Sequence, residues 1–145
     1  MNVNDRFTIS AEREKLDIDV IHTFLTNSYW AEGISKDVIR KSIEGSLCFG
    51  IYDDDKQIGF ARMITDKATF AYLADVFVIE EYQGRGLSKW LIENIMSHPD
   101  LQGLRRMMLA TRDAHGLYSK FGFEPLTHAE RWMQIDDPDI YKKTR

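Results

Sequence analysis

The sequence predicts one α/β domain over residues 1–145, with a central mixed β-sheet flanked by about four helices. Three observations support this prediction. Two β-rich runs are separated by the turn-forming residues 53–56, a pattern typical of an antiparallel hairpin. The next run, residues 69–79, is almost continuously apolar, as in a strand covered on both faces. A helical pattern and another apolar run follow, so these last two strands are expected to be parallel.

The first half of the chain contains this hairpin and the elements before it. Residues 7–10 alternate between apolar and polar side chains, as a short strand does. Apolar residues then recur twice at helical spacing, and Asp17 and Ser35 stand where each helix needs an N-cap. The expected helices and hairpin strands lie at residues 18–25, 38–43, 47–52 and 58–64.

The second half continues with a helix, a strand and a shorter helix. Residues 87–96 have the pattern of an amphipathic helix, and residues 106–110 that of the strand it leads into. Asp113 is placed to cap a short helix that stops at Gly122. The segment 131–135 is expected to close the sheet as a last strand.

Composition excludes several classes of protein. The formal net charge of −4 argues against an extended nucleic-acid surface, because such surfaces neutralise phosphates with Lys and Arg. No stretch approaches the ~20 apolar residues of a membrane span. Residues 1–6 lack the apolar core of a secretion signal, so a cytoplasmic location is expected. The one cysteine, Cys48, is expected to be a buried thiol, and the histidines show no metal-ligand spacing, so no metal is expected.

The segment between the apolar strand and the following helix is rich in glycine. Residues 78–88 read Val-Ile-Glu-Glu-Tyr-Gln-Gly-Arg-Gly-Leu-Ser. Gly84 and Gly86 allow backbone N–H groups to point into one small volume at a helix N-terminus, where the helix dipole also favours negative charge. This pattern indicates a phosphate-binding loop, with a plain tight turn as the alternative. Positive charge for such a ligand is available nearby, from Arg85, Lys89, Arg112 and Lys120.

A second segment, residues 111–123, reads Thr-Arg-Asp-Ala-His-Gly-Leu-Tyr-Ser-Lys-Phe-Gly-Phe. Together the two segments resemble the GCN5-related N-acetyltransferase (GNAT) family, and the resemblance covers residues 46–125. In that family a Gln/Arg-x-x-Gly-x-Gly/Ala loop binds the pyrophosphate of acetyl-coenzyme A. Gln83, Gly86 and Ser88 occupy these motif positions, with Ser88 in place of the usual third Gly or Ala.

The resemblance implies a GNAT-like fold and direct transfer of an acetyl group from acetyl-CoA to a primary amine in a ternary complex, without a metal. It also implies that a main-chain N–H on the strand carrying Val78 stabilises the oxyanion. Thr111 stands where Asn is commoner in the family, which weakens one expected polar contact to the cofactor. The cofactor-binding residues that the resemblance implies are Phe77, Val78, Gln83, Gly84, Arg85, Gly86, Leu87, Ser88, Thr111 and Tyr118.

Acetyl transfer to an amine needs an acid for the leaving thiolate and a base for the amine. Tyr118 matches the family's tyrosine and is the expected acid, since a phenol of pKa ~10 can protonate a nascent thiolate; packing on the sheet is its alternative role. Asp75 is the expected base, directly or through a water, because burial in an apolar strand would raise its pKa. An ion pair with Arg62 is the competing interpretation. His115, three residues before Tyr118, is either a second base or an ordinary surface histidine.

In the resembled family the loop between the first two helices covers the acceptor side of the sheet, and here that loop carries Tyr29, Trp30 and Glu32. Two aromatic rings and a carboxylate can hold an ammonium group by cation–π attraction and charge. Arg62, on a neighbouring strand, is assigned to the same substrate site. A small cationic amine is therefore expected in preference to a protein lysine or N-terminus. The alternative is that Trp30 anchors the core and Glu32 is a solvated charge.

Two other interpretations of the whole chain stay open. The same fold could bind acyl-CoA as a sensor and catalyse nothing. The glycine loop could also belong to an unrelated nucleotide-binding or interaction protein, although it lacks the Gly-Lys-Ser/Thr ending of a Walker loop. The sequence leaves open whether the chain forms a homodimer.

Overall fold

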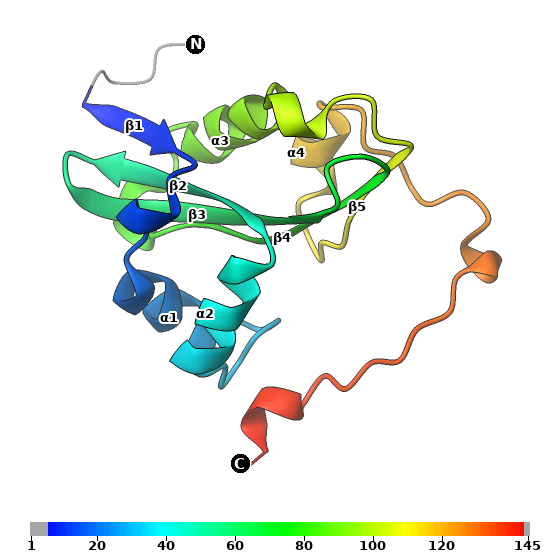
Figure 1. Ribbon diagram of the computed structural model, residues 1–145, viewed down its shortest axis with the longest axis horizontal. Helices are drawn as coiled ribbons and strands as arrows, with labels where there is room; N and C mark the ends of the chain where they lie inside the picture. The colour runs from blue at the N-terminus through cyan, green and yellow to red at the C-terminus, as the bar shows by residue number, and fades with distance from the viewer. Residues whose placement is uncertain (1–5, 144–145) are drawn as a thin grey trace.

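The computed structural model describes residues 6–143 and contains a five-stranded sheet covered by helices on both faces (Figure 1). Helices α1 and α2 lie on one face, and α3 and α4 lie on the other. The strands are β1 (Phe7–Ser10), β2 (Leu47–Asp53), β3 (Lys56–Thr65), β4 (Phe70–Val78) and β5 (Arg106–Leu109). The helices are α1 (Ile18–Thr26), α2 (Lys36–Glu44), α3 (Leu87–Met96) and α4 (His115–Ser119). Short 3₁₀ helices lie at Arg13–Lys15, Glu80–Tyr82, Pro99–Leu101, Ala129–Arg131 and Ile140–Lys142.

The order of the strands in the sheet follows their order in the chain. β1 to β4 are antiparallel neighbours, whereas β5 is parallel to β4 because α3 crosses the sheet between them. The predicted mixed sheet, its hairpin and its parallel crossover are therefore confirmed. The pairing of β4 with β5 is short, and it ends where Leu73 lies opposite Leu109.

An apolar core lies on each face of the sheet. Successive strand residues point to opposite faces, so Phe77 joins the core beneath α1 and α2 whereas Val78 joins the core beneath α3. Cys48 lies in the core with α1 and α2, where burial raises the pKa of its thiol to about 11. The thiol is therefore protonated at neutral pH and packs as a small apolar side chain, as predicted.

The predicted N-caps of the first two helices are confirmed, whereas that of the last is wrong. Asp17 and Ser35 each accept a hydrogen bond from a backbone N–H of the first helical turn, at 3.0 and 3.2 Å. Helix α4 begins after Ala114, and the hydroxyl of Thr111, not the carboxylate of Asp113, accepts a hydrogen bond from the Ala114 N–H at 3.1 Å. A hydroxyl three residues before an N–H can reach it within a single turn, and α4 itself, with Ala114 as its N-cap, has no side-chain cap.

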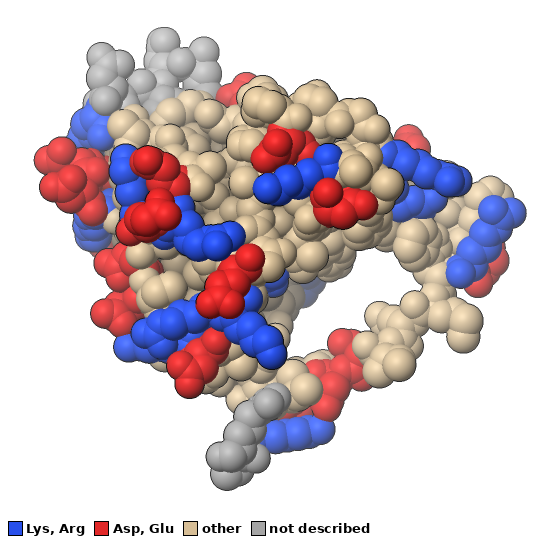
Figure 2. Space-filling view, viewed as in Figure 1, with Lys and Arg blue, Asp and Glu red and all other residues tan. Residues whose placement is uncertain are grey.

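The predicted last strand, residues 131–135, is also wrong. Within the described chain these residues have no strand partner, and Met133 and Ile135 are 96% and 105% exposed. The chain turns at His128, whose φ of 56° lies in the left-handed region, and then passes the start of β5 without pairing with it: the Arg106 guanidinium carbon lies 4.6 Å from the centre of the Trp132 ring. Residues 124–139, here called the C-terminal arm, lie apart from the body for most of their length (Figure 1) and border an opening in the surface (Figure 2).

The chain rejoins the body after the C-terminal arm, at the loop that follows α1. Tyr141 packs against the core of α1 and α2, and its carbonyl oxygen lies 2.6 Å from where a Cβ at Gly33 would stand. Lys142 forms an ion pair with Glu32 at 3.4 Å. The C-terminal arm is thus anchored at both ends, at α4 and at this loop.

Candidate active site

The sheet is irregular in the second half of β4. The β3 residues on either side of Ala61 lie opposite Phe77 and Ala74. Asp75 and Val76 therefore stand opposite the single residue Ala61, which makes a β-bulge, and Asp75 has φ 58°. A bulge bends its strand and turns a side chain to a new direction, so it marks this point of the sheet as a candidate site.

The sheet also opens at this point. β5 ends after the pair Leu73 and Leu109, whereas β4 continues to Val78. Along this last part of β4, no strand of the described chain pairs on the β5 side, so main-chain groups there are left for other partners. An extended ligand can bind such an edge through main-chain hydrogen bonds.

The glycine loop lies at the end of this opening. After Val78 the chain passes through a 3₁₀ helix to Gly84 (φ 80°) and Gly86 (φ 78°), and α3 begins at Leu87. Gly86 is the N-cap and makes no side-chain bond, so the first N–H groups of α3 lack partners inside the helix. A Cβ at Gly84 would meet no atom within 4 Å, so the space beside the loop is open. This geometry favours an anion site over a plain turn.

Several of the predicted cofactor residues have partners inside the chain. The Gln83 amide donates to the Val78 carbonyl at 2.8 Å and ties the loop to the end of β4. The Arg85 guanidinium lies 5.1 Å from the centre of the Tyr82 ring. Thr111, as described above, accepts a hydrogen bond from the N–H of Ala114, the N-cap residue of α4. These side chains shape the loop and the start of α4, which sequence spacing alone does not reveal.

Tyr118 lies on α4 and is 8% exposed. Its ring packs edge-on against Phe123 at 6.0 Å, and burial, with a smaller contribution from Tyr29, raises the pKa of its phenol. Among residues 6–143 its hydroxyl has no hydrogen-bond partner. The phenol is therefore a protonated donor available to a ligand. Tyr118, Thr111 and His115 line a common cavity of about 960 Å³ between α4 and β5.

Asp75 is held by two donors from opposite sides. Arg62 Nε donates to Asp75 Oδ2 at 2.8 Å, and Trp30 Nε1 donates to Asp75 Oδ1 at 2.9 Å. A second nitrogen of Arg62 donates to the Ser46 hydroxyl at 3.2 Å. The ion pair that competed with the base role of Asp75 is therefore present. The bond from Trp30 spans 45 positions of sequence, so no spacing pattern could have predicted it.

Two loops of the candidate site are in contact through Tyr29 and Arg112. Tyr29 belongs to the loop after α1, and Arg112 follows β5; the guanidinium carbon lies 3.9 Å from the centre of the Tyr29 ring. Trp30 contacts the Tyr29 ring edge-on, with the centres 5.1 Å apart. A protein cation thus already lies over one of the two rings that were predicted to hold an ammonium group.

The other predicted acceptor and base residues lie on the surface. The carboxylate of Glu32 is directed to Lys142, whose ammonium also contacts Asp139 at 3.3 Å. His115 is exposed at the first position of α4. The structure thus brings Trp30, Arg62 and Asp75 together but pairs Glu32 with the C-terminal end.

Two searches of residues 6–143 gave negative results. Side chains of His, Cys, Asp and Glu form no group of three or more that could hold a metal ion there. None of the helices in this part of the chain has the length and apolar character needed to cross a membrane.

Comparison with known sequences gives a consistent result. The family model described as "Acetyltransferase (GNAT) domain" matches residues 44–125, which include both motif segments. A protein of Gibberella zeae whose name places it among the acetyltransferases is 31% identical over 137 residues, covering 79% of this chain and 76% of that protein.

Comparison with solved structures supports the same fold. A GNAT-family protein from Xanthomonas campestris pv. campestris is 47% identical, with a TM-score of 0.92, covering 94% of this chain and 97% of that one. A protein of Clostridium acetobutylicum described as a predicted acetyltransferase and solved with acetyl-CoA has a TM-score of 0.66 at 12% identity, covering 90% of this chain and 96% of that one. At this identity it shows a shared fold alone.

Proposed function

This chain belongs to the GNAT family of acetyltransferases, and from that premise we propose that it transfers an acetyl group from acetyl-CoA directly to a primary amine in a ternary complex. One observation carries the proposal. The glycine loop at the N-terminus of α3 adjoins the part of β4 where β5 has ended, so an anion site and an open strand edge are continuous. A ligand with a phosphate group and an extended amide-containing arm fits both.

The residues present suit acetyl-CoA as the co-substrate. The N–H groups at Leu87 and Ser88 and the open space at Gly84 would hold the pyrophosphate, and the edge of β4 at Phe77 and Val78 would hold the arm. When bound, acetyl-CoA supplies the activated acetyl group. A main-chain N–H at this edge would stabilise the oxyanion, because a fixed donor in a partly dry site stabilises developing charge better than water does.

Tyr118 is the proposed acid. Burial keeps its phenol protonated, and its hydroxyl makes no hydrogen bond with the described residues, so the proton is available for the departing thiolate. Packing by the ring is compatible with this role as an acid, since the ring contacts Phe123 while the hydroxyl has no hydrogen-bond partner among the described residues.

Asp75 is the proposed base, directly or through a water, with His115 as the second candidate. Each oxygen of Asp75 already accepts one hydrogen bond, but a carboxylate has about four acceptor positions and can accept more. Arg62 and Trp30 would therefore orient the carboxylate beside the bulge of β4 and leave acceptor positions of its oxygens available.

The proposed acceptor is a small cationic amine that lies against Tyr29 and Trp30. Replacing Trp30 with leucine and Glu32 with glutamine should each raise the acceptor KM about tenfold and leave acetyl-CoA affinity unchanged, as expected if each contributes 1–2 kcal/mol to acceptor binding. Steady-state kinetics with both substrates varied would measure this.

Two further variants serve as controls for the acceptor site. Trp30→Phe keeps a ring but removes the N–H that binds Asp75, so it separates acceptor contact from orientation of the carboxylate. Lys142→Gln removes the partner of Glu32 and leaves the carboxylate in place. Two results would place the acceptor elsewhere. One is a higher acceptor KM in Lys142→Gln than in Glu32→Gln. The other is a Trp30→Leu variant with a lower melting temperature and an unchanged acceptor KM.

The activity itself is tested by measuring CoA thiol release with a panel of amines. We expect release with small diamines and amino-acid-like amines, and little with lysine peptides or peptide N-termini. Release with peptides alone would favour a protein acetyltransferase. Binding of acetyl-CoA without release across the whole panel would favour a sensor that catalyses nothing.

A further inference from the structure

Arg112 is a cation of the candidate site that has no anion beside it. Arg62 is paired with Asp75 at 2.8 Å. The carboxylate of Glu32 is directed away, to Lys142 at 3.4 Å. Among the described residues no carboxylate lies within ion-pair distance of Arg112, and its side chain donates no hydrogen bond there. The N–H donors of its guanidinium group are therefore available to a ligand.

Contact with Tyr29 holds this cation in place. The guanidinium carbon of Arg112 lies over the Tyr29 ring, 3.9 Å from its centre. A guanidinium group bonds through the N–H groups in its plane, and contact with a ring does not use up these donors. Because Tyr29 belongs to a different loop, the contact positions Arg112 before any ligand arrives. A ligand would then lose less free energy in ordering this side chain.

A line of contacts runs from Arg112 to the proposed base and acid. Tyr29 meets Trp30 edge-on, with the ring centres 5.1 Å apart, and Trp30 Nε1 donates to Asp75 Oδ1 at 2.9 Å. Tyr29 also lies close enough to Tyr118 to contribute, after burial, to the raised pKa of its phenol. The unpaired cation and the proposed proton-transfer groups are therefore arranged around one pair of aromatic rings.

The register of the sheet places Arg112 and Asp75 at the same end of the molecule. The last pair between β4 and β5 is Leu73 and Leu109. Asp75 follows this pair on β4, and Arg112 follows it on the chain that leaves β5. Both residues thus belong to the end of the sheet at which the proposed co-substrate would present its acetyl group.

We propose that the acceptor is an amino acid whose carboxylate is bound by Arg112 while its amine lies at Asp75. This inference rests on the proposed function and narrows it. A purely cationic polyamine would bring a further positive charge to Arg112, whereas a carboxylate neutralises that charge and accepts hydrogen bonds from the guanidinium fork at two points. Since the rings of Tyr29 and Trp30 stand between the two groups, an amine several bonds away from the carboxylate suits this arrangement.

The carboxylate takes no part in the transfer itself. The ammonium group of the acceptor loses one proton to Asp75, and from there to solvent. Its nitrogen forms a bond to the acetyl carbon as the C–S bond of acetyl-CoA breaks. The thiolate takes a proton from Tyr118, and the second proton of the nitrogen replaces it. The products are the N-acetyl amino acid and CoA, with the carboxylate still at Arg112.

Kinetics with matched acids and amides test the inference. The probes are β-alanine, γ-aminobutyrate and L-lysine, each compared with its carboxamide, which has a similar shape but no negative charge. For the wild type, kcat/KM should be about ten to a hundred times higher for the acid in at least one pair. In Arg112→Gln this ratio should fall to about one, and in Arg112→Lys, which keeps the charge but not the fork, it should be intermediate. Acetyl-CoA affinity should be unchanged in both variants.

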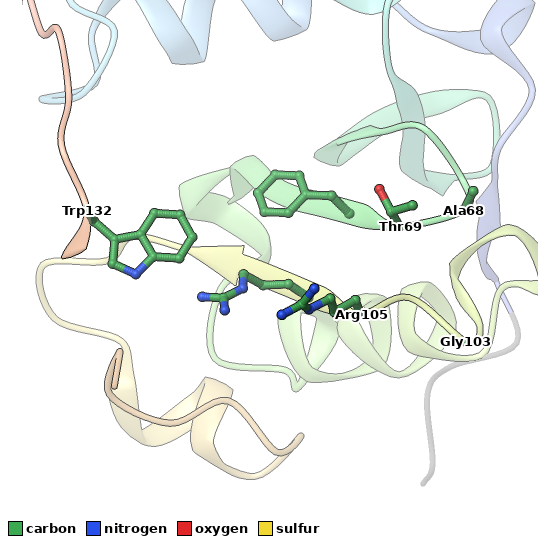
Figure 3. Close-up of a pocket in the computed structure, with 7 residues that line it drawn as sticks. Ala68, Thr69, Gly103, Arg105 and Trp132 are labelled. Atoms are coloured by element: carbon green, nitrogen blue, oxygen red, sulfur yellow. The ribbon is translucent and has the colours of Figure 1, made fainter. Parts of the chain in front are cut away.

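Arg106→Gln is the matched control, because it removes another arginine that contacts an aromatic ring. The guanidinium carbon of Arg106 lies 4.6 Å from the centre of the Trp132 ring, at the start of β5 (Figure 3). This variant should keep the acid-to-amide ratio of the wild type. The inference is overturned if no acid exceeds its amide in the wild type, or if Arg112→Gln keeps the ratio. Lost affinity for acetyl-CoA together with a kept ratio would assign Arg112 to the cofactor instead.

Binding of the same probes separates this inference from the proposed function. Thermal melting with each acid and each amide, in the presence of CoA, requires no turnover. Stabilisation by an acid but not by its amide, lost in Arg112→Gln, supports the carboxylate site even where no amine releases thiol, and then only the proposed transfer fails. Thiol release from amides and diamines as fast as from the acids supports the transfer and overturns the carboxylate site.

Discussion

Replacing Gly86 with valine is expected to abolish the stabilisation of this protein by acetyl-CoA. Gly86 has φ 78° and is the N-cap of α3, where the main chain would come closest to the pyrophosphate. A branched side chain at this position blocks that approach. For the wild type, acetyl-CoA at about a hundredfold excess over its Kd should add about 2.7 kcal/mol to the free energy of unfolding. Thermal melting with and without millimolar acetyl-CoA measures the effect.

Gly103→Val is the matched control for backbone strain. Gly103 also has a left-handed backbone, φ 72°, and a Cβ there would meet no atom within 4 Å. Both variants should lose about 1–2 kcal/mol of stability from strain, but only Gly86→Val should lose the response to acetyl-CoA. If the wild type does not respond at all, the enzyme and the sensor interpretations both fail. If Gly86→Val responds like the wild type, the glycine loop is not the site.

Replacing Tyr118 with phenylalanine is expected to lower kcat about a hundredfold, the usual contribution of one general acid, while acetyl-CoA affinity stays close to that of the wild type. The ring, which packs against Phe123, is kept, so the fold should be unaffected. Tyr52→Phe is the matched control: it removes the hydroxyl of another buried tyrosine, one that has no hydrogen-bond partner among the described residues, and it should change neither kcat nor affinity. Equal losses of affinity and rate in Tyr118→Phe would assign this residue to packing.

The pH dependence of kcat provides a second measurement on Tyr118. Burial raises the pKa of its phenol above the ordinary value of about 10, so the protonated acid persists as the pH rises toward that value. We therefore expect no loss of kcat from deprotonation of this group up to about pH 10, and a loss only above it. An alkaline decline centred below pH 10 that disappears in Tyr118→Phe would contradict the effect of burial.

The parts of the fold that were predicted correctly depend on residues close together in sequence. The hairpin follows from its turn residues, and the caps at Asp17 and Ser35 from the helical pattern that starts directly after them. The glycine loop was found in the same way, because a left-handed backbone at Gly84 and Gly86 requires residues of this kind.

The errors have a common physical origin, which is that a local pattern does not specify its partner. Residues 131–135 were expected to close the sheet, but a strand forms only with a partner, and after the turn at His128 this segment pairs with no strand of the described chain. Asp113 is a good capping residue, yet α4 begins one residue later, with Ala114 as its N-cap and no side-chain cap. Where the helix begins depends on the path of the turn, not on residue type.

The candidate site was only partly predictable for the same reason. The competing interpretations of Asp75 could not be separated from sequence, since its partner Trp30 lies on a distant loop. Glu32 was grouped with Trp30 because they are neighbours in sequence, but its carboxylate reaches the far end of the chain at Lys142. Side-chain direction in an irregular loop is set by tertiary contacts, which a single sequence does not contain.

The opening beside β4 is bordered by peptide groups more than by side chains, and this affects how the protein can evolve. Almost every amino acid carries a backbone N–H, so inheritance of the proposed cofactor site requires a backbone path rather than particular side chains. We therefore expect Ser88, which departs from the family motif, to be tolerated. Tyr29 and Trp30, by contrast, offer side chains from a loop outside the sheet. With the acceptor at this loop, as proposed, mutations there would change the acceptor while acetyl transfer is kept, so new substrate ranges would arise without rebuilding the fold.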